Sequence, residues 1–172
     1  MERTGQPRLT QAQAERIAQD CYADVLAYCR RHAPAGHDAA DLAQETFLRF
    51  VTHGAYREQG RPIAYLMRVA RSVCADAARQ HRLETVPLDL DVPDAQGEAQ
   101  VAETDTDTEL AEALAALPDE LREAVELRFS ADLSVGEVAR ALGISRFAAS
   151  RRLRRALRLL GEALGKKDGD TL

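Results

Sequence analysis

The chain of 172 residues has 45% hydrophobic and 5% aromatic residues, no tryptophan and a formal net charge of −5 at pH 7. This composition is that of a folded protein, and because no apolar run nears 20 residues and no signal-peptide core is present, we expect no membrane insertion and a cytoplasmic location. Since helix formers outnumber β-branched and aromatic residues, we predict an all-α fold.

Three helices are predicted in the N-terminal half. The first covers about 12–33, the second begins at Asp38 and ends by Gly54, and the third runs from Pro62 to about Arg82. Apolar residues at helical spacing should form their common core. These are Ile17, Cys21, Val25 and Tyr28 in the first helix, Ala39, Ala43, Phe47 and Phe50 in the second, and Ile63, Leu66, Ala70, Val73 and Ala77 in the third.

The segment 84–107 lacks periodicity and contains Pro87, Pro93 and Gly97 among acidic residues, so we predict a flexible acidic linker. Residues 84–120 hold 12 of the 28 acidic residues and no Lys or Arg. The remainder of the chain therefore has 23 basic and 16 acidic residues. Two basic lobes are expected on either side of an acidic segment.

Four helices are predicted in the C-terminal lobe. Leu110, Leu114 and Leu117 mark the first, and Leu121, Val125 and Phe129 mark the second, after Pro118. The last two, 135–142 and 146–164, have the layout of a helix-turn-helix. Ser134 and Ser145 should cap them, Gly143 should form the turn and Ile144 should lie between them.

The final helix is expected to turn Ala149, Leu153, Ala156 and Leu160 inward and to hold six arginines from 146 to 158. Such a helix suits a DNA major groove, with its first residues on base edges and later arginines on phosphates. The outward residues are Arg146, Phe147, Ser150, Arg151 and Arg154.

Two faces of the N-terminal lobe also point to partners. The second helix should expose Asp41, Gln44, Glu45 and Leu48, a mixture that suits a protein surface. The third helix should align Arg68, Arg71, Arg79 and Arg82 opposite its apolar stripe, which suits a phosphate backbone. Between these helices, Tyr56 lies among glycines and next to Arg57, where an aromatic ring can stack on an unpaired base.

Three motifs in this order resemble the extracytoplasmic function (ECF) sigma factors. DAADLAQETFLRF at 38–50 is similar to the family's polymerase-binding helix, and RPIAYLMRVARSVCADAARQHR at 61–82 is similar to its promoter-melting helix. LPDELREAVELRF at 117–129 resembles the segment that introduces its terminal helix-turn-helix. The resemblance implies a non-enzymatic subunit that guides core RNA polymerase to promoters, with no cofactor or metal.

The resemblance also implies the domains and the role of each surface. An N-terminal tail (1–11) would precede sigma region two (12–83), the linker (84–107), sigma region four (108–164) and a C-terminal tail (165–172). Asp41, Gln44 and Glu45 would dock on the clamp helices of the largest polymerase subunit, and the flap of the second-largest subunit is a further expected contact. An anti-sigma factor is an expected partner, and nucleoid association is expected when the chain is bound to polymerase.

For promoter DNA, the resemblance implies that Tyr56 captures a flipped base of the downstream element. Ser72 falls where many members have an asparagine that reads this element, with Arg68, Arg71, Arg79 and Arg82 on its backbone. The outward residues of the final helix would contact the upstream element. Phe50 and Tyr65 stand where tryptophan is frequent in the family, and AYLMRVAR resembles the iron-uptake subgroup.

Two other functions fit parts of the sequence. The chain could be a repressor or activator that uses its helix-turn-helix without core polymerase, binding operators as a dimer. It could also be a metal sensor or metal-dependent enzyme that uses Cys21, Cys29, His32 and His37. Against the latter, the three cysteines form no CxxC pair and are odd in number, which predicts buried thiols, and the two imidazoles are expected to face solvent.

Overall fold

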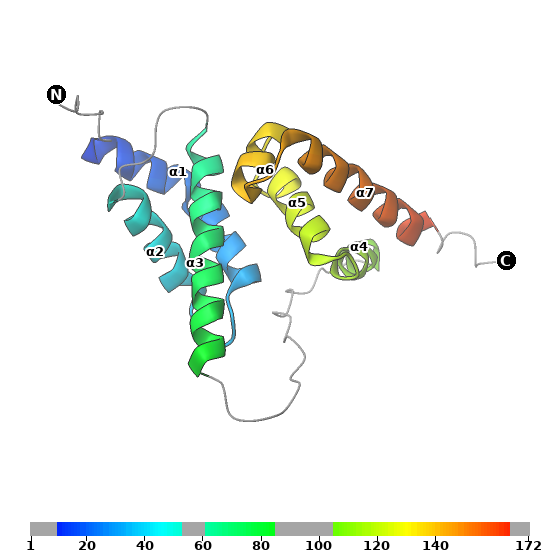
Figure 1. The fold of residues 1–172 in the computed structure, drawn as a ribbon, viewed down its shortest axis with the longest axis horizontal. Helices are drawn as coiled ribbons and strands as arrows, with labels where there is room; N and C mark the ends of the chain where they lie inside the picture. The colour runs from blue at the N-terminus through cyan, green and yellow to red at the C-terminus, as the bar shows by residue number, and fades with distance from the viewer. Residues whose placement is uncertain (1–9, 53–60, 85–104, 166–172) are drawn as a thin grey trace. The chain divides into compact units, whose positions relative to one another are not determined.

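The computed structural model describes residues 10–52, 61–84 and 105–165, and within these ranges the chain forms seven α-helices and no strand (Figure 1). The prediction of an all-α fold is confirmed. The chain separates into two compact units, Met1–Ala95 and Gln96–Leu172, each with its own core. None of the helices in the described ranges is long and apolar enough to span a membrane.

The first unit is a three-helix bundle of α1 (Gln11–His32), α2 (Ala39–Thr52) and α3 (Pro62–Glu84), in which each helix packs on the other two. A reciprocal capping box between Thr10 and Gln13 starts α1 and satisfies amides that the first turn leaves without helical partners. The apolar stripe predicted for α3, from Ile63 to Ala77, is buried throughout.

The buried face of α2 is rotated from the predicted one. Ala43 and Phe50 are buried as expected, but Ala39 and Phe47 are only half-buried. Leu42 and Thr46 take their places in the core. The Thr46 hydroxyl donates to the carbonyl oxygen of Leu42 at 2.8 Å, so its hydrogen bond is satisfied within the helix and the side chain can be buried.

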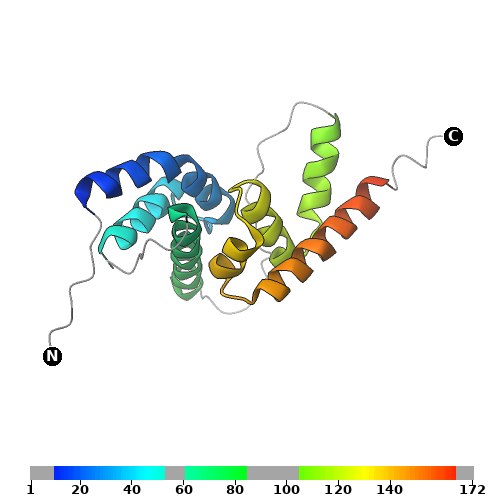
Figure 2. The same cartoon turned by 90° about the horizontal axis from the view of Figure 1, so that it is seen from above.

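The second unit contains α4 (Asp105–Ala115), α5 (Asp119–Phe129), α6 (Val135–Leu142) and α7 (Arg146–Gly165). The long helix α7 packs against all three others, which lie on the same side of it in Figure 2. Its predicted inward residues Ala149, Leu153, Ala156 and Leu160 are buried. The core of this unit is therefore organised by one face of α7, and the opposite face is left for other contacts.

Helices α6 and α7 form the predicted helix-turn-helix. Ser134 caps α6 in a capping box with Glu137, whose carboxylate is buried and accepts from the Ser134 amide at 2.8 Å. Gly143 follows α6 with φ of 67°, a left-handed conformation that glycine adopts without strain. The Ser145 hydroxyl then accepts from the Ala148 amide at 3.1 Å at the start of α7. Ile144 is half-buried between the helices.

Two expectations for the second unit differ from the structure. Phe129 was assigned to the buried stripe of α5, but it is 57% exposed, with the Arg128 guanidinium 5.4 Å from its ring centroid. Ala124 and Leu127 fill the core instead, and Phe129, the last residue of α5, points away from it. The expected linker bounds of 84 and 107 fall inside helices, since α3 ends at Glu84 and α4 begins at Asp105.

Candidate functional site

The outward face of α7 surrounds one phenylalanine with positive charge. Arg146, Phe147, Arg151 and Arg154 are exposed and Ser150 is half-buried. The Phe147 side chain is 87% exposed, the highest value among the large apolar residues of the described ranges. This helix combines a basic surface with an apolar group at its first turn.

The arginines of α7 divide into two groups by their partners. Arg152 turns toward α5, where its Nη2 lies 2.7 Å from Glu120 Oε2, and forms an ion pair between the two helices. Arg151 and Arg154 remain exposed, as do Arg155 and Arg158, which our sequence prediction omitted. The run of six arginines in the sequence could have indicated Arg155 and Arg158. Only the packing of α5 on α7 shows that Arg152 differs from the others, because it is paired with Glu120.

The outward face of α3 carries a second row of cations. Arg68, Arg71, Ser72, Arg79 and Arg82 are all exposed. At about 100° per residue, these five positions fall within roughly 100° of the helix circumference. Ala75 lies in the middle of this sector and is also exposed. Because the side chain of Ala75 is only a methyl group, a partner can approach the α3 backbone closely at this point. The sequence prediction did not include Ala75.

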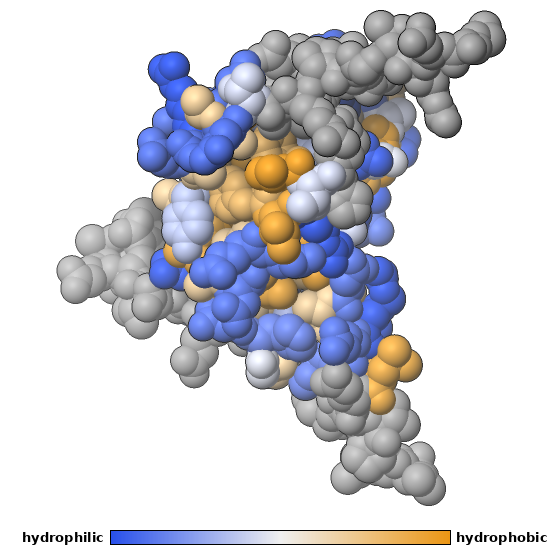
Figure 3. Space-filling model, turned by 90° about the vertical axis from the view of Figure 1, so that its left-hand side faces the viewer, coloured by the Kyte–Doolittle hydropathy of each residue, from blue (hydrophilic) through white to orange (hydrophobic). Residues whose placement is uncertain are grey.

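The outward face of α2 combines acidic, amide and apolar groups. Asp41, Gln44 and Leu48 are exposed, Leu48 by 59%, whereas Glu45 is half-buried. Val51, one helical turn beyond Leu48, is 56% exposed and extends the apolar part of this face. Figure 3 shows apolar side chains at the surface among polar ones. A face of this kind suits a protein partner.

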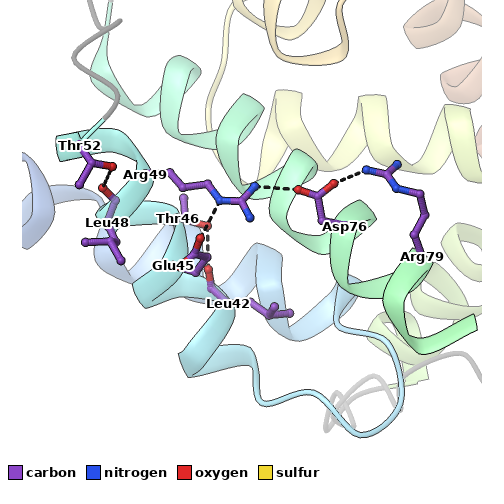
Figure 4. Close-up of polar contacts among 8 residues, drawn as sticks. All are labelled: Leu42, Glu45, Thr46, Leu48, Arg49, Thr52, Asp76 and Arg79. Atoms are coloured by element: carbon purple, nitrogen blue, oxygen red, sulfur yellow. Dashed lines mark hydrogen bonds and ion pairs between the residues drawn. The ribbon is translucent and has the colours of Figure 1, made fainter. Parts of the chain in front are cut away.

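Arg49 joins the α2 face to α3. Its Nε donates to Glu45 Oε1 and its Nη1 donates to Asp76 Oδ2, both at 2.7 Å, and Arg79 donates to the other oxygen of Asp76 (Figure 4). The hydrogen bond from Arg49 holds the pKa of Asp76 below its ordinary value, and the same contact raises the pKa of Arg49. Glu45 and Arg79 are thus held in place by partners within the first unit.

The cysteines and histidines proposed for a metal site are separated by packing. All three cysteines are buried and none of them forms a disulfide, which confirms the prediction of buried thiols. Burial raises the pKa of the Cys21 thiol, whereas a hydrogen bond with Cys74 lowers the pKa of Cys29. His32 and His37 are half-buried rather than solvent-facing, because His32 stacks on Tyr28 with ring centroids 4.2 Å apart and His37 meets His81 edge-on.

Within the described ranges, no group of three or more His, Cys, Asp or Glu side chains is arranged to hold a metal ion. Tyr56 and Arg57 lie outside these ranges, as does most of the predicted acidic linker. The described candidate surfaces are therefore two basic helix faces, one in each unit, and one acidic and apolar face on α2.

Comparison with known proteins bears on these surfaces. Residues 17–84 match the family Sigma-70 region 2, and residues 113–161 match Sigma-70, region 4. The ECF RNA polymerase sigma factor SigD of Mycobacterium tuberculosis is 34% identical over 152 residues, covering 81% of this chain and 71% of its own length. The chain belongs to the ECF RNA polymerase sigma factors.

Other relatives agree with this assignment. The ECF RNA polymerase sigma factor BldN of Streptomyces coelicolor is 34% identical over 153 residues, which cover 84% of this sigma factor and 58% of BldN. The sigma factor RpoE of Bartonella quintana, solved in complex with the anti-sigma factor NepR, shares the fold with a TM-score of 0.65 at 20% identity, covering 88% of this chain and 96% of RpoE. The resemblance read from the three motifs is confirmed, and the sigma factor is not an enzyme.

Within this sigma factor, α2 and α3 lie in region two and α6 and α7 lie in region four. The acidic and apolar face and the first basic face thus belong to one region, and the second basic face belongs to the other. The repressor and metal-enzyme alternatives lose their basis, since both family regions are present in a single chain.

Proposed function

We propose that this sigma factor contacts core RNA polymerase through α2 and holds promoter DNA at two places through α3 and α7. The observation that carries the proposal is the separation of the basic faces. Arg68, Arg71 and Arg82 are exposed on the first unit, while Arg151 and Arg154 are exposed on the second. Two units joined by one chain can grip two DNA elements with moderate affinity each, because the linkage raises the effective concentration of the second contact.

Polymerase binding is assigned to Asp41, Gln44, Glu45 and Leu48, with the clamp helices of the largest subunit as their partner. Leu48 supplies the apolar anchor of this surface, being 59% exposed, and Asp41 supplies an exposed carboxylate two turns earlier on the same face. Glu45 acts with Arg49 as a pair rather than as a lone charge. A contact between the second unit and the flap of the second-largest subunit completes the proposed docking.

Downstream promoter contacts are assigned to Arg68, Arg71, Ser72, Arg79 and Arg82, with Tyr56 capturing a flipped base. Arginines on one helix face neutralise phosphates without reading sequence, so sequence preference falls to Ser72 and Tyr56. A serine hydroxyl can donate one hydrogen bond and accept others, and Ser72 is exposed on the same sector as Arg68. Upstream contacts are assigned to Arg146, Phe147, Ser150, Arg151 and Arg154.

Regulation by an anti-sigma factor is also proposed, because RpoE of Bartonella quintana is bound by the anti-sigma factor NepR in a structure with the same fold. Such a protein would compete with polymerase for exposed surface on the sigma factor. Membership of the iron-uptake subgroup stays a prediction, which mapping of the target promoters tests. Association with the nucleoid is expected only for the complex with polymerase.

Reconstitution tests the proposal. The purified chain is added to core polymerase on genomic DNA, and the transcript starts are sequenced. We expect starts that are absent with core enzyme alone and that share two short sequence elements upstream. A chain that neither co-purifies with core polymerase nor changes its start sites would end the proposal, as would autonomous operator binding by a dimer.

A further inference from the structure

The most exposed large apolar side chain of the described residues lies on the DNA-facing helix. Phe147, at the second position of α7, is 87% exposed. Phenylalanine is more often buried, since its ring contributes a large apolar area. Ala149, two positions later, is fully buried against the core. Because two helical residues differ by about 200°, Phe147 faces away from the unit.

The neighbours of Phe147 on this face are cationic or small and polar. Ser150 is three positions away, Arg151 is four and Arg154 is seven, spacings that place all of them on one side of a helix. Both arginines are exposed. An apolar ring with arginines on the same helix face is unsuited to an apolar protein groove, because docking there would remove the guanidinium groups from water. Double-stranded DNA suits both the arginines and the ring, because it is a polyanion and its major groove contains an apolar group.

We propose that Phe147 makes this sigma factor select thymine at one position of the upstream promoter element, by contact between its ring and the thymine 5-methyl group. This inference rests on the proposed function and adds a base identity to it. The major groove offers polar edges from every base pair and one apolar group, the methyl of thymine. A phenyl ring cannot hydrogen-bond to a base edge, so the methyl group is the feature it can distinguish.

Position along the helix agrees with this role. The first turn of a recognition helix meets base edges, while later residues reach the backbone. Phe147 and Arg146 occupy that turn, and Arg151 and Arg154 follow one and two turns later. The Ser145 cap fixes the start of the helix through its bond to the Ala148 amide at 3.1 Å, so the backbone that carries Phe147 is held in place.

The test uses holoenzyme assembled from the full chain and core polymerase. Bound promoters are selected from a library randomised across the upstream element, with wild-type protein and with Phe147→Ala. We expect wild type to enrich thymine at one position and Phe147→Ala to lose the preference there while keeping preferences elsewhere. Phe129→Ala is the matched control, because Phe129 is 57% exposed in the same unit but lies outside α7, and it should retain the thymine preference.

A second step isolates the methyl group. Replacing that thymine by deoxyuridine should weaken wild-type binding about fourfold, the change that corresponds to burial of one methyl-sized group, and should leave Phe147→Ala unaffected. If selected promoters show upstream preferences that Phe147→Ala does not alter, the role of Phe147 is rejected and the proposed function stands. If Phe147→Ala weakens DNA binding equally on all sequences, or no longer binds core polymerase, the role of Phe147 in base selection is rejected in favour of a contact with protein. If wild type selects no upstream element, both fail.

Discussion

The Arg49 guanidinium of α2 lies 2.7 Å from the Asp76 carboxylate of α3, and this ion pair joins the helix that carries the acidic and apolar face to the helix that carries the first basic face. The two side chains are 32% and 38% exposed, so solvent screens their attraction in part. Within the first unit, the pair links two surfaces that are proposed to bind different macromolecules.

Asp76→Asn removes the charge while keeping the shape of the side chain. We expect the free energy of unfolding to fall by about 0.5 to 1 kcal/mol at neutral pH, a value already discounted for partial exposure. Because the pKa of Asp76 is lowered in the native state, its stabilisation is present above the ordinary carboxyl pKa of about 4 and is lost as the pH falls through the lowered native value. Urea denaturation should therefore show the difference from wild type shrinking below about pH 4. A difference that grows with acidity would contradict this account.

The exposed charge of Asp41 tests the polymerase face with little risk to folding. Asp41→Arg should abolish co-purification with core polymerase while the chain stays folded, with a small loss of stability because Asp41 lies in the first turn of α2, where a carboxylate is favoured. Asp20→Arg makes the same charge change at an exposed position of α1 and should retain binding. Adding Glu45→Arg would also disturb Arg49, so the double variant requires a stability measurement.

Retention of core polymerase by Asp41→Arg in a pull-down would exclude α2 as the docking face. Loss of binding in both Asp41→Arg and Asp20→Arg would instead indicate a general effect of net charge. The comparison thus separates a local contact from long-range electrostatics.

Ala75 offers a direct test of the basic face on α3. Ala75→Glu places a carboxylate in the middle of the sector formed by Arg68, Arg71 and Arg79, and its exposure means that the core is not altered. Holoenzyme with this variant should bind promoter DNA more weakly, and its affinity should depend less steeply on salt because fewer phosphate contacts form. Ala23→Glu, at an exposed position of α1, is the matched control. Equal salt slopes for both variants and wild type would remove α3 from the DNA interface.

Ser134 stabilises the first helix of the helix-turn-helix. Its hydroxyl accepts from the Glu137 amide at 3.3 Å, so Ser134→Ala should destabilise the second unit by about 1 kcal/mol. Hydrogen exchange should report faster opening of the first-turn amides of α6. Ser130→Ala removes an exposed hydroxyl that follows α5 and should leave exchange in α6 unchanged. Unchanged protection in Ser134→Ala would show that the cap contributes nothing measurable.

The three thiols should be inert in the folded protein. Cys21, Cys29 and Cys74 are buried and form no disulfide, and a thiol must reach the reagent as thiolate to react. We expect little modification by a disulfide reagent at neutral pH and prompt modification of all three in concentrated guanidinium chloride. Rapid reaction of one thiol in native protein would show that the first unit opens locally.

Local signals in the sequence determined the helices, their caps and the family. The period of the apolar residues in α3 and α7 matched their buried faces, and Ser134, Gly143 and Ser145 predicted the helix-turn-helix because caps and turns depend on residues within a few positions. The three motifs were sufficient for the ECF assignment, since each is a continuous stretch of chain.

Only the tertiary structure decided which polar side chains are paired with other residues of the chain. Arg152 is paired with Glu120 and Arg49 with Asp76, contacts between residues distant in sequence that periodicity cannot predict. The same holds for the core position of Thr46 and the exposure of Phe129, because each depends on which face of its helix the neighbouring helices cover. Helical period gives the direction of a side chain, whereas its burial and its partners are set by the helices packed against it.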